Sequence, residues 1–151
     1  MTPDELRPIL ADYRKQVQRA WSKATAAPGF EGADGSPVGQ CGVTSAWLRN
    51  QLWADHGIWT AYRIGTAWRL GDDNPVSDHC WLEIGRGWER IIIDLTAGQM
   101  EGLPDDAMFC ETFRTLCSYE ISYVANSCLS DAQLAEDPVQ ARLALLEGAL
   151  S

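Results

Sequence analysis

The sequence predicts an α+β fold in which one helix packs against a small antiparallel β-sheet. The chain has 151 residues, enough for one domain with a sizeable core. Apolar side chains recur at helical spacing towards both ends of the chain, whereas the middle of the chain has the pattern of strands. Because these strands follow one another with little helix between them, we expect them to pair antiparallel in a single domain over residues 1–151.

The first predicted helix begins close to the N-terminus. Thr2, Pro3 and Glu5 fit the N-cap, first-turn and capping-box positions of a helix. A proline beyond the first turn bends a helix, so a start nearer Pro8 is the alternative. The apolar positions that follow at helical spacing are Leu6, Ile9, Leu10, Tyr13, Val17, Ala20 and Trp21.

A long loop and a second helix come next. Gly, Pro and Asp punctuate residues 26–39, which predicts a loop of a length that often borders a binding site. The second helix is expected from about Cys41 to His56, and Gly57 suits the position that ends it. His56 suits the negative end of the helix dipole, and a backup general base is its alternative role.

Alternating side chains predict the strands. Over residues 60–70, one strand face carries Tyr62, Ile64, Trp68 and Leu70. The remaining elements follow in order: a turn-rich connection over residues 71–78, a hairpin over 79–94, a helix over 105–115, a strand over 117–125, and a helix from residue 130 onward that Pro138 interrupts.

Composition and charge narrow the classes of partner. The formal net charge is −9, with 21 acidic against 12 basic residues, so we expect neither nucleic acid nor a membrane surface as a partner. No apolar run is long enough to span a bilayer, and the N-terminus lacks the pattern of a secretory signal. Five scattered cysteines favour reduced thiols in a cytoplasmic protein. A specialised route of secretion and the oligomeric state stay open.

Cys41 is the candidate nucleophile. It stands where the long loop meets the second helix, and the positive end of a helix dipole favours the nucleophilic thiolate form. Its neighbours Gly39, Gln40 and Gly42 are small or polar, so the sulfur is not forced into the core. A small residue of the core is the alternative role for a cysteine at a helix start.

The hairpin predicts a partner pair for this thiol. If Arg86 and Gly87 are the two turn residues, His79 and Asp94 lie directly opposite each other on one face of the sheet. A turn shifted by one residue makes them diagonal neighbours, still on the same face. The alternative is a histidine–aspartate pair with a purely structural role.

Cys41, His79 and Asp94 together supply the groups that thiol acyl transfer needs. The cysteine attacks a carbonyl carbon, the histidine moves the proton, and the aspartate orients the imidazole ring. The developing oxyanion needs a hydrogen-bond donor, for which the Gln40 side chain and the Cys41 N–H are the two candidates.

Three segments in the same order resemble the transglutaminase-like superfamily, which also has papain-type relatives. GQCGVTSAWL around Cys41 resembles its nucleophile segment, HCWLEIG its His-x-Trp-x-Glu strand, and IIIDLTAGQ its Asp-x-Thr strand end. The resemblance covers about residues 39–99. It implies a nucleophile helix packed on an antiparallel sheet, the triad of Cys41, His79 and Asp94, and peptidase, amidase, deamidase or cross-linking activity. Gly42 departs from the pattern, because the cross-linking enzymes typically carry a tryptophan there.

Several neighbouring residues have alternative roles. Trp81 lies on the strand face of His79, where it either walls a substrate cleft or shields the histidine–aspartate pair from water. Cys80 points to the opposite face and is expected in the core. Glu83 and Arg90 are expected to form a cross-strand ion pair. The acidic residues just before His79 are either solvated or favour a cationic substrate side chain; they are Asp72, Asp73 and Asp78.

The sequence therefore predicts an enzyme that hydrolyses an amide through a thioester at Cys41, acting on a peptide, protein or small amide. Gln40, Gly42 and Trp81 are its candidate oxyanion and substrate-binding residues. No metal or other cofactor is expected, because the remaining cysteines lack paired zinc-site spacing. Capture of the thioester by an amine is the alternative reaction, and a non-catalytic binding module on the same fold is the alternative class.

Overall fold

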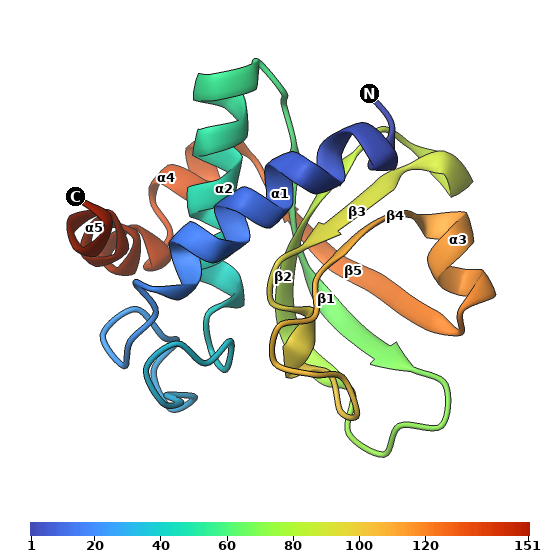
Figure 1. Ribbon diagram of the computed structural model, residues 1–151, viewed down its shortest axis with the longest axis horizontal. Helices are drawn as coiled ribbons and strands as arrows, with labels where there is room; N and C mark the ends of the chain where they lie inside the picture. The colour runs from blue at the N-terminus through green and yellow to red at the C-terminus, as the bar shows by residue number, and fades with distance from the viewer.

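The computed structural model describes all residues 1–151 and has an α+β fold built on one five-stranded antiparallel sheet (Figure 1). The strand order is β4-β3-β2-β1-β5, so the hairpin of β2 and β3 lies at the centre. The five strands are β1 (Ala61–Arg69), β2 (Val76–Ile84), β3 (Ile91–Asp94), β4 (Phe109–Thr112) and β5 (Ile121–Leu129).

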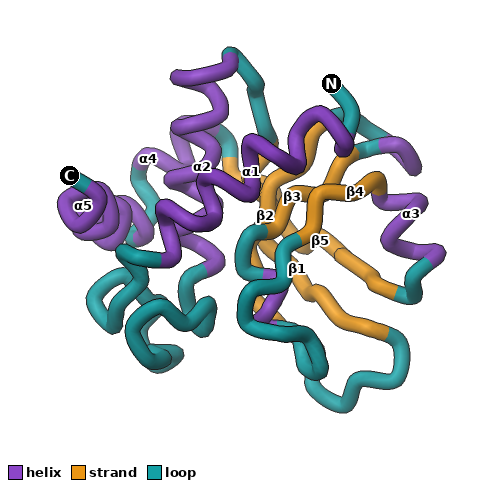
Figure 2. The backbone as a smooth tube through the Cα atoms, viewed as in Figure 1, coloured by secondary structure: helices purple, strands orange, loops and turns teal.

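The helices are divided unequally between the two sides of the sheet. Helices α1 (Pro3–Gln18), α2 (Cys41–His56) and α5 (Val139–Leu150) gather on one side, together with the short α4 (Asp131–Ala135). Helix α3 (Phe113–Ser118) lies on the other side, as Figures 1 and 2 show. Two single-turn 3₁₀ helices, η1 (Gly87–Glu89) and η2 (Ala97–Gln99), complete the fold. The main apolar core lies between the sheet and helices α1, α2 and α5.

Both long N-terminal helices begin where the sequence predicts. The Thr2 hydroxyl accepts from the Glu5 N–H, and the Glu5 carboxylate accepts from the Thr2 N–H, which confirms the capping box. The alternative start near Pro8 is wrong, since α1 continues through that residue. Helix α2 ends at Gly57, whose φ of 64° is the left-handed conformation that terminates a helix.

The predicted two-residue turn at Arg86 and Gly87 is wrong. Strands β2 and β3 pair Leu82 with Ile93 and Ile84 with Ile91, so residues 85–90 form a wider connection that contains η1. Glycines in the left-handed conformation at both 85 and 87 permit this longer path. The register is offset by two residues from the predicted one. Because an offset of two keeps every side chain on its face, the expected proximity of histidine and aspartate survives.

A β-bulge in β2 directly precedes His79. Gly65 of β1 pairs with His79, whereas Ala67 pairs with Val76, so β2 carries one extra residue between these pairs. Asp78 in this segment has a φ of 52°, a left-handed conformation that is uncommon for residues other than glycine. A bulge bends its strand and redirects the neighbouring side chain. The side chain redirected here is the histidine of the candidate site.

Two other expectations fail in the second half of the chain. The helix predicted over residues 105–115 is wrong, because residues 109–112 form β4 and α3 begins only at Phe113. Pairing with β3 decides this segment, while local sequence gives little sign of it. The strand predicted over 117–125 is displaced to Ile121–Leu129. Of the residues predicted to share a face over 60–70, Tyr62 and Ile64 pack against the main core, whereas Leu70 lies beyond the end of β1 and is exposed. The C-terminal helix is interrupted at Pro138 as predicted.

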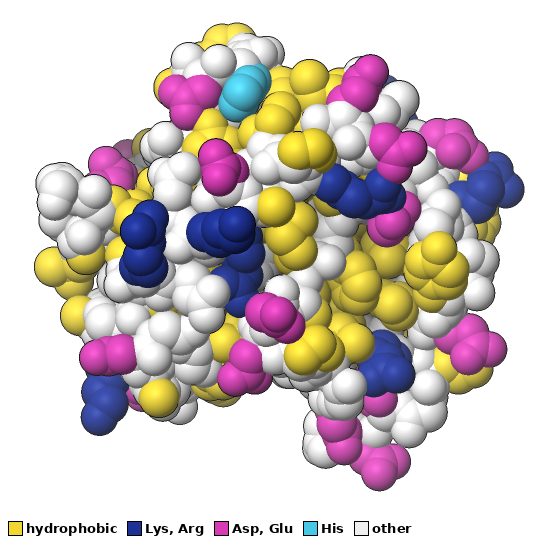
Figure 3. Space-filling model, viewed as in Figure 1, with side chains coloured by type: hydrophobic (Ala, Val, Ile, Leu, Met, Phe, Trp, Pro, Cys, Tyr) yellow, Lys and Arg dark blue, Asp and Glu magenta, His cyan; other side chains and the backbone are white.

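No helix is both long and apolar enough to cross a membrane. On the face drawn in Figure 3, acidic side chains are spread widely and basic side chains form only small separate groups.

Gly65 is predicted to be essential for the pairing of β1 with β5. A Cβ atom at this position would lie 2.0 Å from the Val124 carbonyl oxygen, a backbone atom that cannot move without breaking the sheet. We expect Gly65→Ala to lower the free energy of unfolding by about 3 kcal/mol, measured by denaturant titration. Gly148→Ala is the matched control, since nothing lies within 4 Å of its Cβ position, and it should stabilise α5 by about 0.5 kcal/mol. Equal effects of the two changes would contradict this packing account.

Candidate active site

Cys41 is the first residue of α2 and is 9% exposed. The first backbone hydrogen bond of the helix runs from the Thr44 N–H to the Gln40 carbonyl, at 3.0 Å. The three N–H groups before it, of Cys41, Gly42 and Val43, therefore have no acceptor within the helix. They lie at the positive end of the helix dipole, where they are able to receive an anionic oxygen.

His79 and Asp94 form a buried pair, as the sequence predicts. Nε2 of His79 lies 2.6 Å from Oδ2 of Asp94, and both side chains are at most 1% exposed. Burial lowers the pKa of His79, but the charge and hydrogen bond of Asp94 and the contact with Cys41 raise it more, to about 10. The histidine is therefore an imidazolium at neutral pH.

The second ring nitrogen of His79 remains available. Nδ1 is buried and makes no well-aligned hydrogen bond. The Cys41 thiol is the group that approaches the ring besides Asp94, and it is close enough to affect the pKa of His79. Long or poorly aligned contacts between a nucleophile and its base are usual before substrate binds. Asp94 thus fixes one ring nitrogen and leaves the other for the thiol.

Asp94 is held by more than the histidine. The Tyr123 hydroxyl donates to Oδ2 at 2.6 Å, while the Thr96 N–H and hydroxyl donate to Oδ1 at 2.9 and 3.1 Å. Burial would raise the pKa of the Asp94 carboxyl, but the His79 charge and these hydrogen bonds hold it below its usual value. The carboxylate stays ionised and fixed in orientation.

Cys80 contacts Cys41, the candidate nucleophile, which the sequence did not reveal. It is buried in the core as expected, and there it shares a hydrogen bond with Cys41. That bond, followed by the hydrogen bond and charge of His79, lowers the pKa of Cys41 well below its ordinary value against the opposing effect of burial. The same bond and burial raise the pKa of Cys80, so Cys80 remains the thiol that donates and Cys41 is the thiolate.

Trp81 shields the histidine instead of lining the cleft at Cys41. It is fully buried, and its ring stacks on His79 with centroids 6.1 Å apart. Its indole N–H donates to Oε2 of Glu83 at 2.8 Å. Of the two roles left open by the sequence, this geometry matches exclusion of water from the histidine–aspartate pair.

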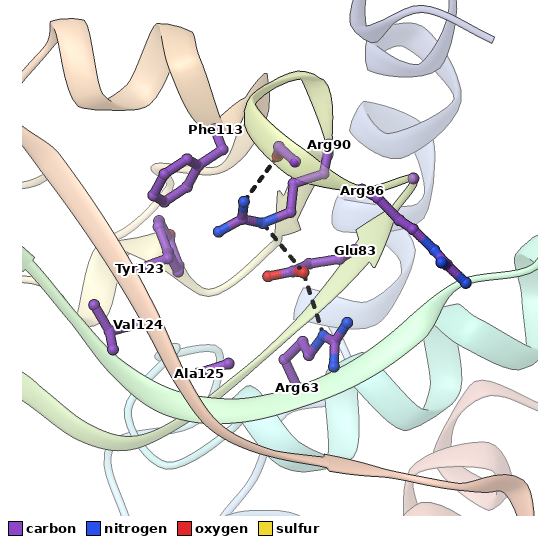
Figure 4. A pocket seen from close by; sticks show the side chains of 10 residues that line it. Arg63, Glu83, Arg86, Arg90, Phe113, Tyr123, Val124 and Ala125 are labelled. Carbon is purple, nitrogen blue, oxygen red and sulfur yellow. Dashed lines mark hydrogen bonds and ion pairs between the residues drawn. The ribbon is translucent and has the colours of Figure 1, made fainter.

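Glu83 also lies between two arginines, Arg63 and Arg90, as Figure 4 shows. The predicted ion pair with Arg90 forms at 3.4 Å, and Arg63 adds a second at 3.2 Å. Both arginines approach the same carboxylate oxygen, Oε1, which leaves Oε2 for Trp81. The cavity of about 450 Å³ beside them is lined by none of Cys41, His79 and Asp94, so it is separate from the candidate triad.

Gln40 lies next to Cys41, but its side chain is engaged elsewhere. Its Nε2 donates to the Ser22 carbonyl at 2.9 Å, and its Oε1 accepts from the Thr25 hydroxyl at 2.8 Å. These bonds tie the start of α2 to the turn after α1. The oxyanion role of the Gln40 side chain therefore stays a prediction, and the unpaired backbone N–H groups are the donors already in place.

Gly42 has no room for a large side chain. Its carbonyl accepts from the Tyr62 hydroxyl at 3.2 Å, and a Cβ would lie 3.3 to 3.6 Å from Tyr62, Val139 and Arg142. Side chains of β1 and α5 thus fill the space that a tryptophan at position 42, typical of cross-linking enzymes, would need.

A cleft of about 260 Å³ opens beside Cys41. The loop over residues 26–39 forms one wall, as its length led us to expect, and the bulged start of β2 together with η2 forms the other. The residues that line it are Ala27, Phe30, Gly39, Cys41, Pro75, Val76, Ser77, Asp78 and Gln99.

The other candidate groups are dispersed. His56 is exposed at the end of α2, beside Tyr13, and does not line this cleft. All five cysteines are free thiols, and no group of three or more His, Cys, Asp or Glu side chains is placed to hold a metal ion.

No protein-family model, curated protein or solved structure matches this chain. We therefore infer a function from the positions of the chain's own residues.

Cys41 is predicted to react as a thiolate well below pH ~8.5, the pKa of a free thiol. Alkylation of Cys41 by iodoacetamide, followed by peptide mass spectrometry, should stay fast down to the lowered pKa of this thiol. Cys80→Ala and His79→Ala each remove a group that stabilises the thiolate, so each should move the profile to higher pH. Cys80→Ser, which keeps a donor, should move it less.

Cys117→Ala is the control for this experiment, because Cys117 lies apart from the cleft. The assignment of the thiolate would be contradicted if the alkylation rate of the wild type rose only near pH ~8.5 and if neither His79→Ala nor Cys80→Ala moved this profile.

Proposed function

We propose that this protein is a cysteine enzyme that hydrolyses an amide bond through a thioester at Cys41. One observation carries the proposal: the helix start that bears Cys41 meets a buried, oriented pair of His79 and Asp94. Nucleophile, base and orienting carboxylate on three separate elements are the arrangement that acyl transfer requires. The fold we propose for it is transglutaminase-like, on the strength of the resemblance and of the α2–sheet packing.

Acylation in this proposal begins from a Cys41 thiolate and a His79 imidazolium, the states that their shifted pKa values favour. The Cys41 thiolate attacks the carbonyl carbon and forms the C–S bond, and the carbonyl oxygen becomes an oxyanion near the N–H groups of Cys41 and Gly42. The C–N bond then breaks as the His79 imidazolium gives its proton to the leaving nitrogen. The amine departs, and the acyl group remains on sulfur as a thioester.

Deacylation reverses the roles. Neutral His79 takes a proton from water, and the water oxygen attacks the thioester carbonyl carbon. The C–S bond breaks, which releases a carboxylic acid and restores the thiolate beside the imidazolium. Asp94 stabilises each imidazolium state and holds the ring orientation between the two steps.

The crowding at Gly42 favours hydrolysis over cross-linking. Cross-linking needs a second site where an amine reaches the thioester in place of water. The tryptophan found at this position in cross-linking enzymes has no space here, so an amine substrate would approach the thioester without a tryptophan beside it.

Turnover is predicted to depend on both the Cys41 thiol and the His79 imidazole. We expect Cys41→Ala and His79→Ala to lower the rate of amide hydrolysis by about a thousandfold or more. The rate is measured on a panel of peptide and small amide substrates, with protein purified under reducing conditions. The acyl-enzyme should be visible in the wild type as a mass increase on Cys41 that hydroxylamine removes.

His56→Ala is the matched control, since it changes the other histidine of the chain and should leave turnover intact. A protein that acts only by binding would keep full affinity for its partner in His79→Ala and would form no adduct on Cys41. That result would replace the enzyme with a binding module.

A further inference from the structure

We propose that the cleft beside Cys41 selects amide substrates with an arginine- or lysine-like cation next to the scissile carbonyl, and that Asp78 pairs with this cation. The inference rests on the proposed hydrolase function and specifies its substrate class. Two independent features of the cleft support it: an unpaired carboxylate and an unpaired buried amide.

Asp78 is the only ionisable side chain that lines the cleft besides Cys41. It is exposed to solvent and forms no salt bridge, although seven ion pairs occur elsewhere in the chain. No Lys or Arg lines this cleft. A cation that enters therefore meets a carboxylate with no competing partner.

The position of this carboxylate follows from the bulge that positions the histidine. Asp78 occupies the left-handed conformation immediately before His79, so the backbone geometry that directs the imidazole also places the carboxylate at the cleft.

The walls of the cleft suit the stem of a long cationic side chain. Phe30 is 66% exposed, and it stands with Pro75 and Val76 around the opening. Apolar groups of this kind pack along the methylene carbons of lysine or arginine while the charged end stays near water. The volume of about 260 Å³ is at the small end for a ligand site, which suits one such side chain better than a folded polymer segment.

Gln99 supplies the second feature. Its Oε1 accepts from the Gly39 N–H at 3.2 Å, which fixes the orientation of the amide. Its Nε2 is buried without any hydrogen-bond partner, and Gln99 lines the cleft. A buried donor left unpaired is costly, and a backbone carbonyl of a peptide-like substrate would satisfy it once the Gln99 amide turns toward the cleft. Asp78 and Gln99 thus point to one ligand with a cation and a carbonyl.

The test compares two irreversible probes that need no turnover. They are peptidyl chloromethyl ketones identical except for the residue next to the warhead, which is arginine in one and citrulline in the other. Citrulline keeps the length and shape of arginine but has no charge. The second-order rate constant for alkylation of Cys41 is measured for each probe, and we expect arginine to react about tenfold faster.

Asp78→Asn removes the charge and keeps a residue type that tolerates the left-handed conformation. It should reduce the preference for arginine over citrulline, taken as the ratio of the two rate constants in the same variant, to about twofold or less. Asp73→Asn is the matched control, because it removes the same charge from the connection just before β2 but does not line the cleft, and it should keep the preference. Added salt should weaken the preference in the wild type.

The outcomes separate this inference from the proposed function. Equal rates for the two probes, both modifying Cys41, would overturn the cation specificity and leave the nucleophile in place. A preference that persists in Asp78→Asn would overturn the role of this carboxylate. Failure of both probes to modify Cys41 in the folded protein would overturn the proposed function, and the inference would fall with it.

Discussion

The rest of the structure depends on the buried pair of His79 and Asp94. Removing two charged groups from water is expensive, and it is offset only when the remaining hydrogen-bonding capacity of both groups is used. Asp94 meets this condition through Tyr123 and Thr96, which saturate its two oxygens. His79 does not, because Nδ1 remains without an aligned partner. This unpaired nitrogen faces Cys41 at the start of α2, whose thiolate form is stabilised by the charge of the imidazolium.

The strands and helices around the pair follow from this constraint. Strand β2 carries the bulge that redirects His79, the tryptophan that covers its ring, and the second cysteine that donates to the thiolate from the opposite face. Gly42 lets α2 approach Tyr62 and α5 closely, which keeps the first turn of the helix against the sheet. Under the proposed mechanism, four consecutive residues of one strand, 78–81, would serve as a specificity group, a base, a thiolate donor and a shield.

Local sequence predicts part of this arrangement well. Residues close in the chain decide the limits of α2 and the capping box of α1. The shared strand face of His79 and Asp94 is also predicted, because a register error of two residues leaves every side chain on the same face of the sheet. The features that could not be predicted depend on pairing between distant segments. Strand β4 exists because β3 offers an open edge, and the bulge before His79 is visible only as a mismatch with β1. The contact of Cys80 with Cys41 requires both the bulge and the helix packing, so strand alternation alone places it only in the core.

The protonation state of His79 tests the central claim most directly, since an ion pair with Cys41 requires an imidazolium at neutral pH. The chain has two histidines, so His56→Gln leaves one ring to observe by ¹⁵N-resolved NMR. We predict that both ring nitrogens of His79 carry protons at pH 7, that the ring loses a proton only near its pKa of about 10, and that Cys41→Ala lowers this pKa. A neutral ring with a single protonated nitrogen at pH 7, unaffected by the change at Cys41, would contradict the account.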